Sequence, residues 1–81
     1  MLLKELLEVL NTNTQIKIDT PTKWVVNEPT YVKDTKRDVS NYLEHKVINV
    51  ELRRKDYYDF YLYIEIEEYS AAQKETLWWN S

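Results

Sequence analysis

Apolar and polar residues alternate with two different periods along the chain, and each period predicts a different kind of element. Leucines recur at positions 2, 3, 6, 7 and 10, with charged residues among them. Apolar spacings of three and four place side chains on one face of a helix. The polar run 11–14 follows, and its side chains compete for backbone hydrogen bonds. We therefore expect a helix over about residues 2–10.

A first hairpin is predicted downstream of this helix. Residues 15–19 alternate with period two, so both isoleucines face inward from a half-buried strand. A three-residue turn leads to a returning strand at 23–26, and this turn places Trp24 in the core opposite Ile18. Pro29 cannot donate a ladder hydrogen bond, so it ends the strand or marks it as a sheet edge.

A second, shorter helix is expected between two hairpins. The side chain of Asp38 is suited to capping a helix N-terminus, and Val39, Tyr42 and Leu43 follow at helical spacing. His45 stands at the expected C-terminal end of this helix, which predicts a ring near solvent. Because it is the only histidine of the chain, a histidine-rich metal site is not expected. Neither Ser40 nor Glu44 is at a spacing that faces His45 on a helix, so a nucleophile–base pair is not expected either.

The second hairpin has the most regular pattern. Even positions are apolar and odd positions are mainly polar in both 47–53 and 59–67. Pairing the two runs around a loop at 54–58 places Leu52 opposite Phe60, with the even positions facing the core. A slip of one residue would turn the apolar side chains to solvent, so the facing of this hairpin is well specified.

The order of these elements predicts an α+β fold. Residues 70–73 resemble a capping box and indicate a short closing helix or turn. We expect residues 1–81 to form a single domain, a two-layer sandwich of a four-stranded antiparallel sheet (two hairpins) with short helices mainly on one face. The expected core consists of Leu3, Leu6, Leu7, Leu10, Ile16, Ile18, Trp24, Val26, Leu43, Ile48, Val50, Leu52, Phe60, Leu62, Ile64 and Ile66.

The composition excludes several classes of function. The chain has no glycine, so it cannot build the glycine-rich loops that bring a backbone close to phosphate. It has no cysteine, which excludes disulfides and thiolate metal sites. A net charge of −3 disfavours a phosphate-backbone binder, and aspartates dilute the basic clusters at 33–37 and 53–55, so direct nucleic-acid binding is not expected. No cofactor or metal is expected.

The N-terminal residues indicate in which compartment of the cell the protein is expected. Lys4 and Glu5 interrupt the apolar start of the chain, unlike the core of a signal peptide. No apolar run approaches the roughly 20 residues that span a bilayer. We therefore expect a cytoplasmic protein that does not enter a membrane.

The outward positions of the second hairpin are the best candidate for a contact surface. They bring tyrosines and carboxylates together on one sheet face, and tyrosines offer a large, rigid contact area with a polar tip. The carboxylates at 65 and 67 are expected to be solvated rather than to hold a cation or act as acid and base, and no catalytic residue is assigned. Spaced carboxylates also resemble the phosphates of a nucleic acid, whereas strand propensity alone explains tyrosines equally simply. The expected partner-binding residues are Glu51, Tyr61, Tyr63, Glu65, Glu67, Trp78 and Trp79.

Three stretches carry a resemblance to a known group. The leucine-rich opening with the strand 15–19, the Val-Ile-Asn-Val strand at 47–50 and the closing strand 62–67 resemble small uncharacterised phage and prophage proteins of Gram-positive bacteria. The resemblance covers most of residues 1–67. It implies an accessory role in the cytoplasm of a bacterial host, where such proteins often act on host proteins, including defence systems.

Two hypotheses about function therefore follow. The first is a non-enzymatic phage-type protein that binds a macromolecular partner, with inhibition of a host defence protein as one form of this role. The second is a structural or self-assembling module that forms a homo-oligomer through the tyrosines or the adjacent tryptophans.

Overall fold

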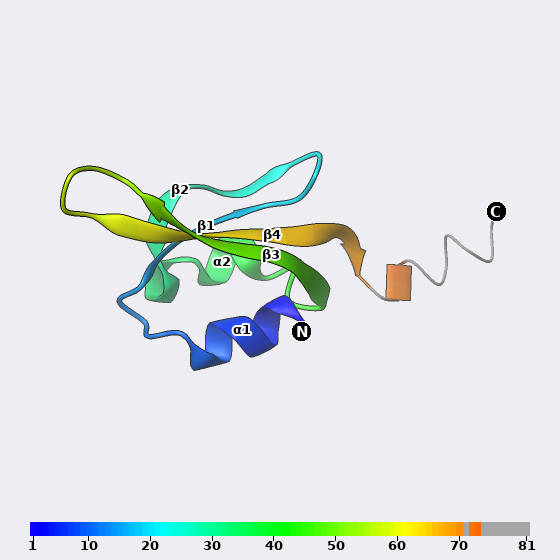
Figure 1. Cartoon of the computed structure of the whole chain (residues 1–81). Coiled ribbons are helices and arrows are strands. Elements are labelled where there is room, and N and C mark those ends of the chain that lie inside the picture. Colours follow the sequence, from blue (N-terminus) through cyan, green and yellow to red (C-terminus); the bar gives the residue numbers. More distant parts are fainter. Residues whose placement is uncertain (71, 74–81) are drawn as a thin grey trace.

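The computed structural model describes residues 1–70 and 72–73 and shows an α+β structure with a four-stranded sheet and short helices (Figure 1). The elements in chain order are α1 (Leu3–Val9), β1 (Gln15–Asp19), β2 (Trp24–Tyr31), the 3-10 helix η1 (Val32–Asp34), α2 (Lys36–Val39), β3 (His45–Arg54) and β4 (Phe60–Ser70). The strands and the first helix lie where the hydrophobic periods predicted them. Within the described residues, none of the helices is long and apolar enough to cross a membrane.

The sheet is mixed, and the prediction of a purely antiparallel sheet was wrong. The strand order is β2-β1-β4-β3, in which β1 and β4 are parallel and the other two pairs are antiparallel. In the parallel pair Ile16 lies beside Leu62 and Ile18 beside Ile64. The two strands that contribute fully buried isoleucines thus form the centre of the sheet, where both of their edges are paired (Figure 1).

The core is smaller than the sequence predicted. Its buried apolar residues are Leu3, Ile16, Ile18, Val26, Val39, Ile64 and Ile66. Leu3 belongs to α1 and Val39 to α2, so each helix contributes one buried side chain to the cluster formed by the strands. Leu6, Leu7, Leu10, Leu43 and Leu62 are partly buried against this cluster.

Five residues of the expected core are exposed. They are Trp24, Ile48, Val50, Leu52 and Phe60, and the side chains of Trp24 and Leu52 are 74% and 70% exposed. Ile48, Val50 and Leu52 lie on β3, which is the last strand of the sheet. Among the described strands, β3 pairs with β4 alone. A helix of seven residues and one of four cannot extend over the whole width of such a sheet. For Val50, Leu52 and Phe60 the alternation therefore predicted which way the side chains face, and the short helices leave them uncovered.

In the second hairpin, Val50 and Leu52 each lie opposite a β4 residue two positions further along the chain than predicted. Leu52 lies opposite Leu62 and Val50 opposite Ile64, around a loop at 55–59 instead of 54–58. Hydrogen bonds within the loop determine this position, because the Lys55 amide donates to the Asp59 carbonyl at 2.8 Å. Both ends of the loop move by one residue, so even positions still pair with even positions between Asn49 and Arg54, and the predicted facing is retained there. At the start of β3 an irregularity in the pairing places Val47 opposite Ile66, so the predicted parity does not hold for that part of the strand.

The first hairpin is less regular than its pattern indicated. Asp19 lies opposite Trp24 and Ile18 opposite Val26, with register shifts on both sides of Ile18. The Thr20 hydroxyl accepts the Lys23 amide at 2.9 Å, so the turn extends over residues 20–23. The shift turns Trp24 away from the core, which explains why its predicted burial was wrong. β2 continues through Pro29 as an edge strand, as proline requires.

The second helix and the histidine also differ from the prediction. α2 begins one residue after Thr35 and ends at Val39, so Asp38 is not its N-cap. His45 is the first residue of β3 and is only 4% exposed, not near solvent. Its Nδ1 lies 2.7 Å from the Glu67 carbonyl oxygen, and its ring packs 5.0 Å from the Tyr42 ring. The histidine is therefore a hydrogen-bonded core residue that joins the start of β3 to β4.

The capping box at the end of β4 is present. The Ser70 amide donates to Gln73 Oε1 at 2.7 Å, and the Gln73 amide donates to Ser70 Oγ at 3.2 Å. This reciprocal pair is the one that the sequence predicted at 70–73. The predicted contact residues Trp78 and Trp79 lie outside the described residues.

Candidate functional site

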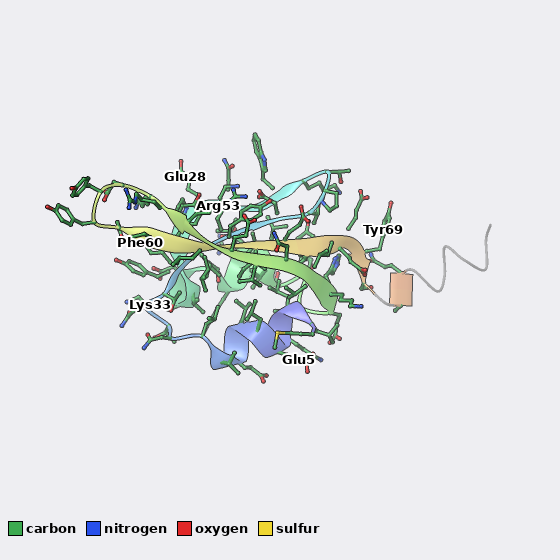
Figure 2. All side chains as sticks on the ribbon, in the orientation of Figure 1. Glu5, Glu28, Lys33, Arg53, Phe60 and Tyr69 are labelled. Carbon is green, nitrogen blue, oxygen red and sulfur yellow. The ribbon has the colours of Figure 1, made fainter. Side chains whose placement is uncertain are left out.

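The candidate site is the face of the sheet opposite the buried isoleucines. Ile64 and Ile66 point into the core, so the alternation of β4 turns the odd residues of this strand to the other side. We call this surface the tyrosine face and define it by Lys17, Asp19, Glu51, Arg53, Tyr61, Tyr63 and Glu65. Figure 2 shows Arg53 and Phe60 on opposite sides of the β3–β4 hairpin, which marks the two faces.

The pairing of three strands brings these residues into register. Lys17 of β1 and Glu51 of β3 lie on either side of Tyr63. Asp19 lies beside Glu65, and Arg53 lies opposite Tyr61. The tyrosine face therefore combines residues of β1 with residues of β4, and these two strands are more than 40 positions apart in the sequence.

Tyr63 is held between two cations. The guanidinium carbon of Arg53 lies 3.7 Å from the centre of its ring, and the Lys17 ammonium lies 5.3 Å from it. Cations over an aromatic face are attracted to the ring and restrict its motion. The ring is also half-buried, so Tyr63 is presented as a fixed aromatic surface and not as a freely rotating side chain.

Asp19 is a nearly buried carboxylate in the tyrosine face. The residue is 8% exposed, and its Oδ2 accepts a hydrogen bond from the Lys17 ammonium at 2.7 Å. Its Oδ1 is buried without a hydrogen-bond partner and is, among the described residues, the sole buried side-chain oxygen or nitrogen in this state. A buried carboxylate oxygen without a donor is costly. The Tyr63 hydroxyl also interacts with this carboxylate, and the interaction contributes to the raised pKa of Tyr63.

A second charge pair lies at the exposed end of this surface. The Arg53 guanidinium donates two hydrogen bonds to Glu51 Oε2, at 3.1 and 2.9 Å. These hydrogen bonds from Arg53 lower the pKa of the Glu51 carboxyl, with a further contribution from Asn49. The same contact raises the pKa of Arg53. Glu51 is thus ionised and oriented, and it directs Arg53 over the Tyr63 ring.

The structure brings together four of the seven predicted contact residues. Glu51, Tyr61, Tyr63 and Glu65 lie on adjacent strands of one face, as expected. Glu67 is half-buried near the bulged start of β3, and its backbone carbonyl is the partner of the buried histidine. The predicted set did not include Arg53, although the alternation of β3 places it on this face, and sequence reasoning missed Lys17 and Asp19. Their alternation with the inward isoleucines placed them on an outer face, but only the parallel pairing of β1 and β4 brings that face beside Tyr63.

The opposite side of the hairpin carries a separate apolar surface. We call Ile48, Val50, Leu52 and Phe60 the apolar row; all four are exposed. The row continues toward the loop 55–59, where Tyr57 and Tyr58 are exposed and pack edge to face with ring centres 4.8 Å apart. In Figure 1 this end of the hairpin extends beyond the ends of β1 and β2. Isolated exposed apolar residues are common, whereas a row of them indicates a contact surface.

An open groove of about 580 Å³ lies between α1 and the segment 32–43. Leu7, Val32, Val39 and Leu43 form its apolar part, and Lys33 and Lys36 are among its polar lining residues. Lys4 also lines it and is paired with the Glu44 carboxylate at 2.7 Å. The groove contains apolar side chains and ammonium groups, and neither its threonines nor its serine is paired with a base that would form a reactive centre.

Comparisons with known proteins found no match to this chain, whether among family models, curated proteins or solved structures. In the part of the chain that the structure describes, no group of three or more histidine, aspartate and glutamate side chains is arranged to hold a metal ion.

The environment of Tyr63 predicts a measurable pH effect. Burial raises the pKa of the Tyr63 hydroxyl, and the negative charge of Asp19 adds to this effect. A raised pKa in the folded state means that this phenol stabilises the fold fully below its unfolded pKa of about 10. The contribution is lost as the pH rises through the folded pKa. Tyr63→Phe should therefore lose less stability than the parent protein between about pH 8 and about pH 11.

Urea unfolding at the two pH values measures this difference. The matched control is Tyr57→Phe, which removes a phenol that is 76% exposed. Its loss of stability at high pH should equal that of the parent protein. An equal loss in Tyr63→Phe would contradict the assigned environment of Tyr63.

Proposed function

We propose that this chain is a non-enzymatic binding protein that acts in the cytoplasm of a bacterial host, in the phage accessory role that the sequence resemblance implies. In this proposal the helices lie mainly on one face of the sheet, and the tyrosine face on the other side contacts a protein partner. The observation that carries the proposal is the half-buried Tyr63 ring, with cations 3.7 and 5.3 Å from its centre, beside the Asp19 carboxylate.

The charges of the tyrosine face support a basic partner. Asp19, Glu51 and Glu65 outnumber the cations Lys17 and Arg53, and both cations already have carboxylate partners at 2.7 and 2.9 Å. An arginine or lysine from a partner could donate to the exposed Glu51 carboxylate while its stem lies on a tyrosine ring. Rigid aromatic residues of this kind dominate the energy of protein interfaces, where truncating a central one costs about 2 kcal/mol or more.

Inhibition of a host defence protein is one form of this role, and imitation of nucleic acid is a second way to reach a basic surface. The two differ in the residues that supply the affinity. An aromatic contact depends on Tyr61 and Tyr63, whereas a nucleic-acid mimic depends on carboxylates and is weakened steeply by salt. Tyr63 lies at the centre of the face, with Glu51 and Lys17 on the adjacent strands, and this arrangement favours the aromatic contact.

A pull-down from a lysate of the bacterial host, analysed by mass spectrometry, tests the proposal. The change is Tyr61→Ala with Tyr63→Ala, and we expect the partner recovered by the parent protein to be lost. The matched control is Tyr57→Ala with Tyr58→Ala, which removes two tyrosines from the exposed loop and should leave recovery unchanged. Circular dichroism establishes that each variant remains folded.

Two results would count against the tyrosine face. One is retention of the partner by the folded Tyr61/Tyr63 variant, and the other is loss of the partner in the loop control alone. Tyr63→Phe retains the ring and should retain the partner. Glu51→Gln with Glu65→Gln separates the two mechanisms, since it should weaken an aromatic contact little and a nucleic-acid mimic strongly.

A self-assembling module is the second candidate function. The apolar row favours it, because four exposed apolar side chains in a strand and its partner are a surface that another chain could cover. This row is distinct from the tyrosines and tryptophans that the sequence suggested for self-association.

A further inference from the structure

The outer edge of β3 is open to another strand over part of its length. The strand order places β3 at one side of the sheet, and among the residues that the structure describes β4 is its only neighbouring strand. The first residues of β3 are covered, because Leu2 forms a bridge with Lys46 and the Val47 amide donates to the Met1 carbonyl at 2.8 Å. Beyond them, residues 48–54 run along the edge to the loop. A strand edge of this length is a ready site for pairing with another chain.

The hydrogen-bonding pattern identifies which residues present their backbone at this edge. The Lys55 amide donates to the Asp59 carbonyl, which marks 55 and 59 as a hydrogen-bonded pair of the hairpin. Such pairs recur at every second residue of an antiparallel ladder, so residues 51 and 53 are bonded toward β4. The amides and carbonyls of Val50, Leu52 and Arg54 consequently point away from β4. The edge and the apolar row thus coincide at Val50 and Leu52.

We propose that this edge binds a second copy of the chain, with the two β3 strands antiparallel about a two-fold axis at Leu52. This register pairs Leu52 with Leu52 and Val50 with Arg54, so the open backbone groups of both strands meet. It also places each Glu51 opposite the Arg53 of the other copy, on the same face of the sheet. The edge is therefore complementary to itself in backbone, in apolar surface and in charge.

The covered residues at the start of β3 distinguish this register from its neighbours. A two-fold at Val50 would direct Arg53 and Arg54 of one copy toward Val47 and Lys46 of the other, where Met1 and Leu2 already occupy the edge. A two-fold at Glu51 would bring two carboxylates face to face, which is unfavourable. The register about Leu52 avoids both conflicts. It also carries the loop 55–59 of each copy, with its exposed tyrosines, toward Ile48 of the other.

The resulting dimer has a continuous sheet of eight strands. The apolar rows of the two copies meet on one side of it, and the two tyrosine faces meet on the other. Dimerisation does not depend on the proposed function of the tyrosine face, because the Tyr61 and Tyr63 side chains lie away from the pairing edge, on β4. A partner with two basic sites would, however, encounter both faces at once, which increases its avidity.

Analytical ultracentrifugation of the full chain tests the proposal. The parent protein should be a reversible dimer at high micromolar concentration. Leu52→Lys places two ammonium groups at the two-fold axis and should weaken the dimer by about 30-fold or more, which corresponds to loss of a buried leucine contact. Val9→Lys changes an apolar residue of similar exposure on α1 and should leave the dimer intact. Circular dichroism should show both variants folded.

A charge reversal tests the register itself. Arg53→Glu opposes two carboxylates across each pair and should weaken the dimer by about 10-fold, since cross-strand pairs contribute up to about 1 kcal/mol each. The double change Glu51→Arg with Arg53→Glu reverses both charges and should restore the parent affinity. The proposal is overturned if the parent protein is monomeric at high micromolar concentration. It is equally overturned if folded Leu52→Lys dimerises as the parent does, or if the double change fails to restore affinity.

Discussion

Replacing Ile64 by alanine should lower the free energy of unfolding by about 2–5 kcal/mol, the usual cost of emptying a fully buried isoleucine site. Ile64 is completely buried between β1 and β3, beside Ile18 and opposite Val50. Leu52→Ala, at a residue that faces the same side of the hairpin, should cost less than about 0.5 kcal/mol in the monomer. Urea unfolding at low micromolar protein concentration, where the proposed dimer dissociates, gives both values.

Comparing the two variants distinguishes the direction in which a side chain points from the extent to which it is buried. The hydrophobic pattern treats Ile64 and Leu52 alike, whereas the structure leaves Leu52 70% exposed. If both changes lower the free energy of unfolding equally at low protein concentration, another part of the protein must cover Leu52 in the monomer. A cost for Leu52→Ala that grows with protein concentration would instead report the loss of dimer contacts.

Replacing Lys17 by methionine should destabilise the fold by about 2 kcal/mol. The change removes the ammonium that donates to Asp19 Oδ2 at 2.7 Å and leaves this nearly buried carboxylate without its cation. Fully buried ion pairs cost about 3–5 kcal/mol when one partner is removed, and this pair keeps some contact with solvent. Thermal and urea unfolding at neutral pH measure the loss.

Two further variants determine whether the unpaired charge is the cause. Asp19→Asn removes the charge in the Lys17→Met background and should restore at least half of the lost stability. Lys4→Met breaks an ion pair of the same length, 2.7 Å, between exposed side chains, and should change stability little. A large effect in Lys4→Met, or no recovery in the double variant, would remove burial of Asp19 as the explanation.

Local patterns predicted the elements because they report which side of an element faces away from water. The leucine spacing of α1, the alternation of β1 and β4, and the capping box at 70–73 all appear in the structure close to their predicted positions. The prediction for the second hairpin was wrong in register but right in facing, since the loop moved by one residue at both ends. Hydrogen bonds inside the loop determine this shift in register, and the hydrophobic pattern contains no information about them.

The tyrosine face was predicted in part for the same reason. Odd positions of β4 had to face away from the isoleucines, so Tyr61, Tyr63 and Glu65 could be grouped on one surface from the sequence. Lys17 and Asp19 could not be added to that group. Their proximity to Tyr63 depends on which strands are neighbours, and strand order is a long-range property that alternation within one strand does not contain.

The sequence by itself determined the types of the elements, the inward residues of the central strands and the absence of glycine-dependent and cysteine-dependent chemistry. Tertiary structure alone decided that β1 and β4 pair in parallel, that His45 is buried, and that Ile48, Val50 and Leu52 are exposed. The physical reason is that the facing of a side chain follows from local geometry, whereas its burial requires another element to cover it. In this chain the helices contribute one fully buried apolar side chain each, so the last strand of the sheet keeps an apolar side in contact with solvent.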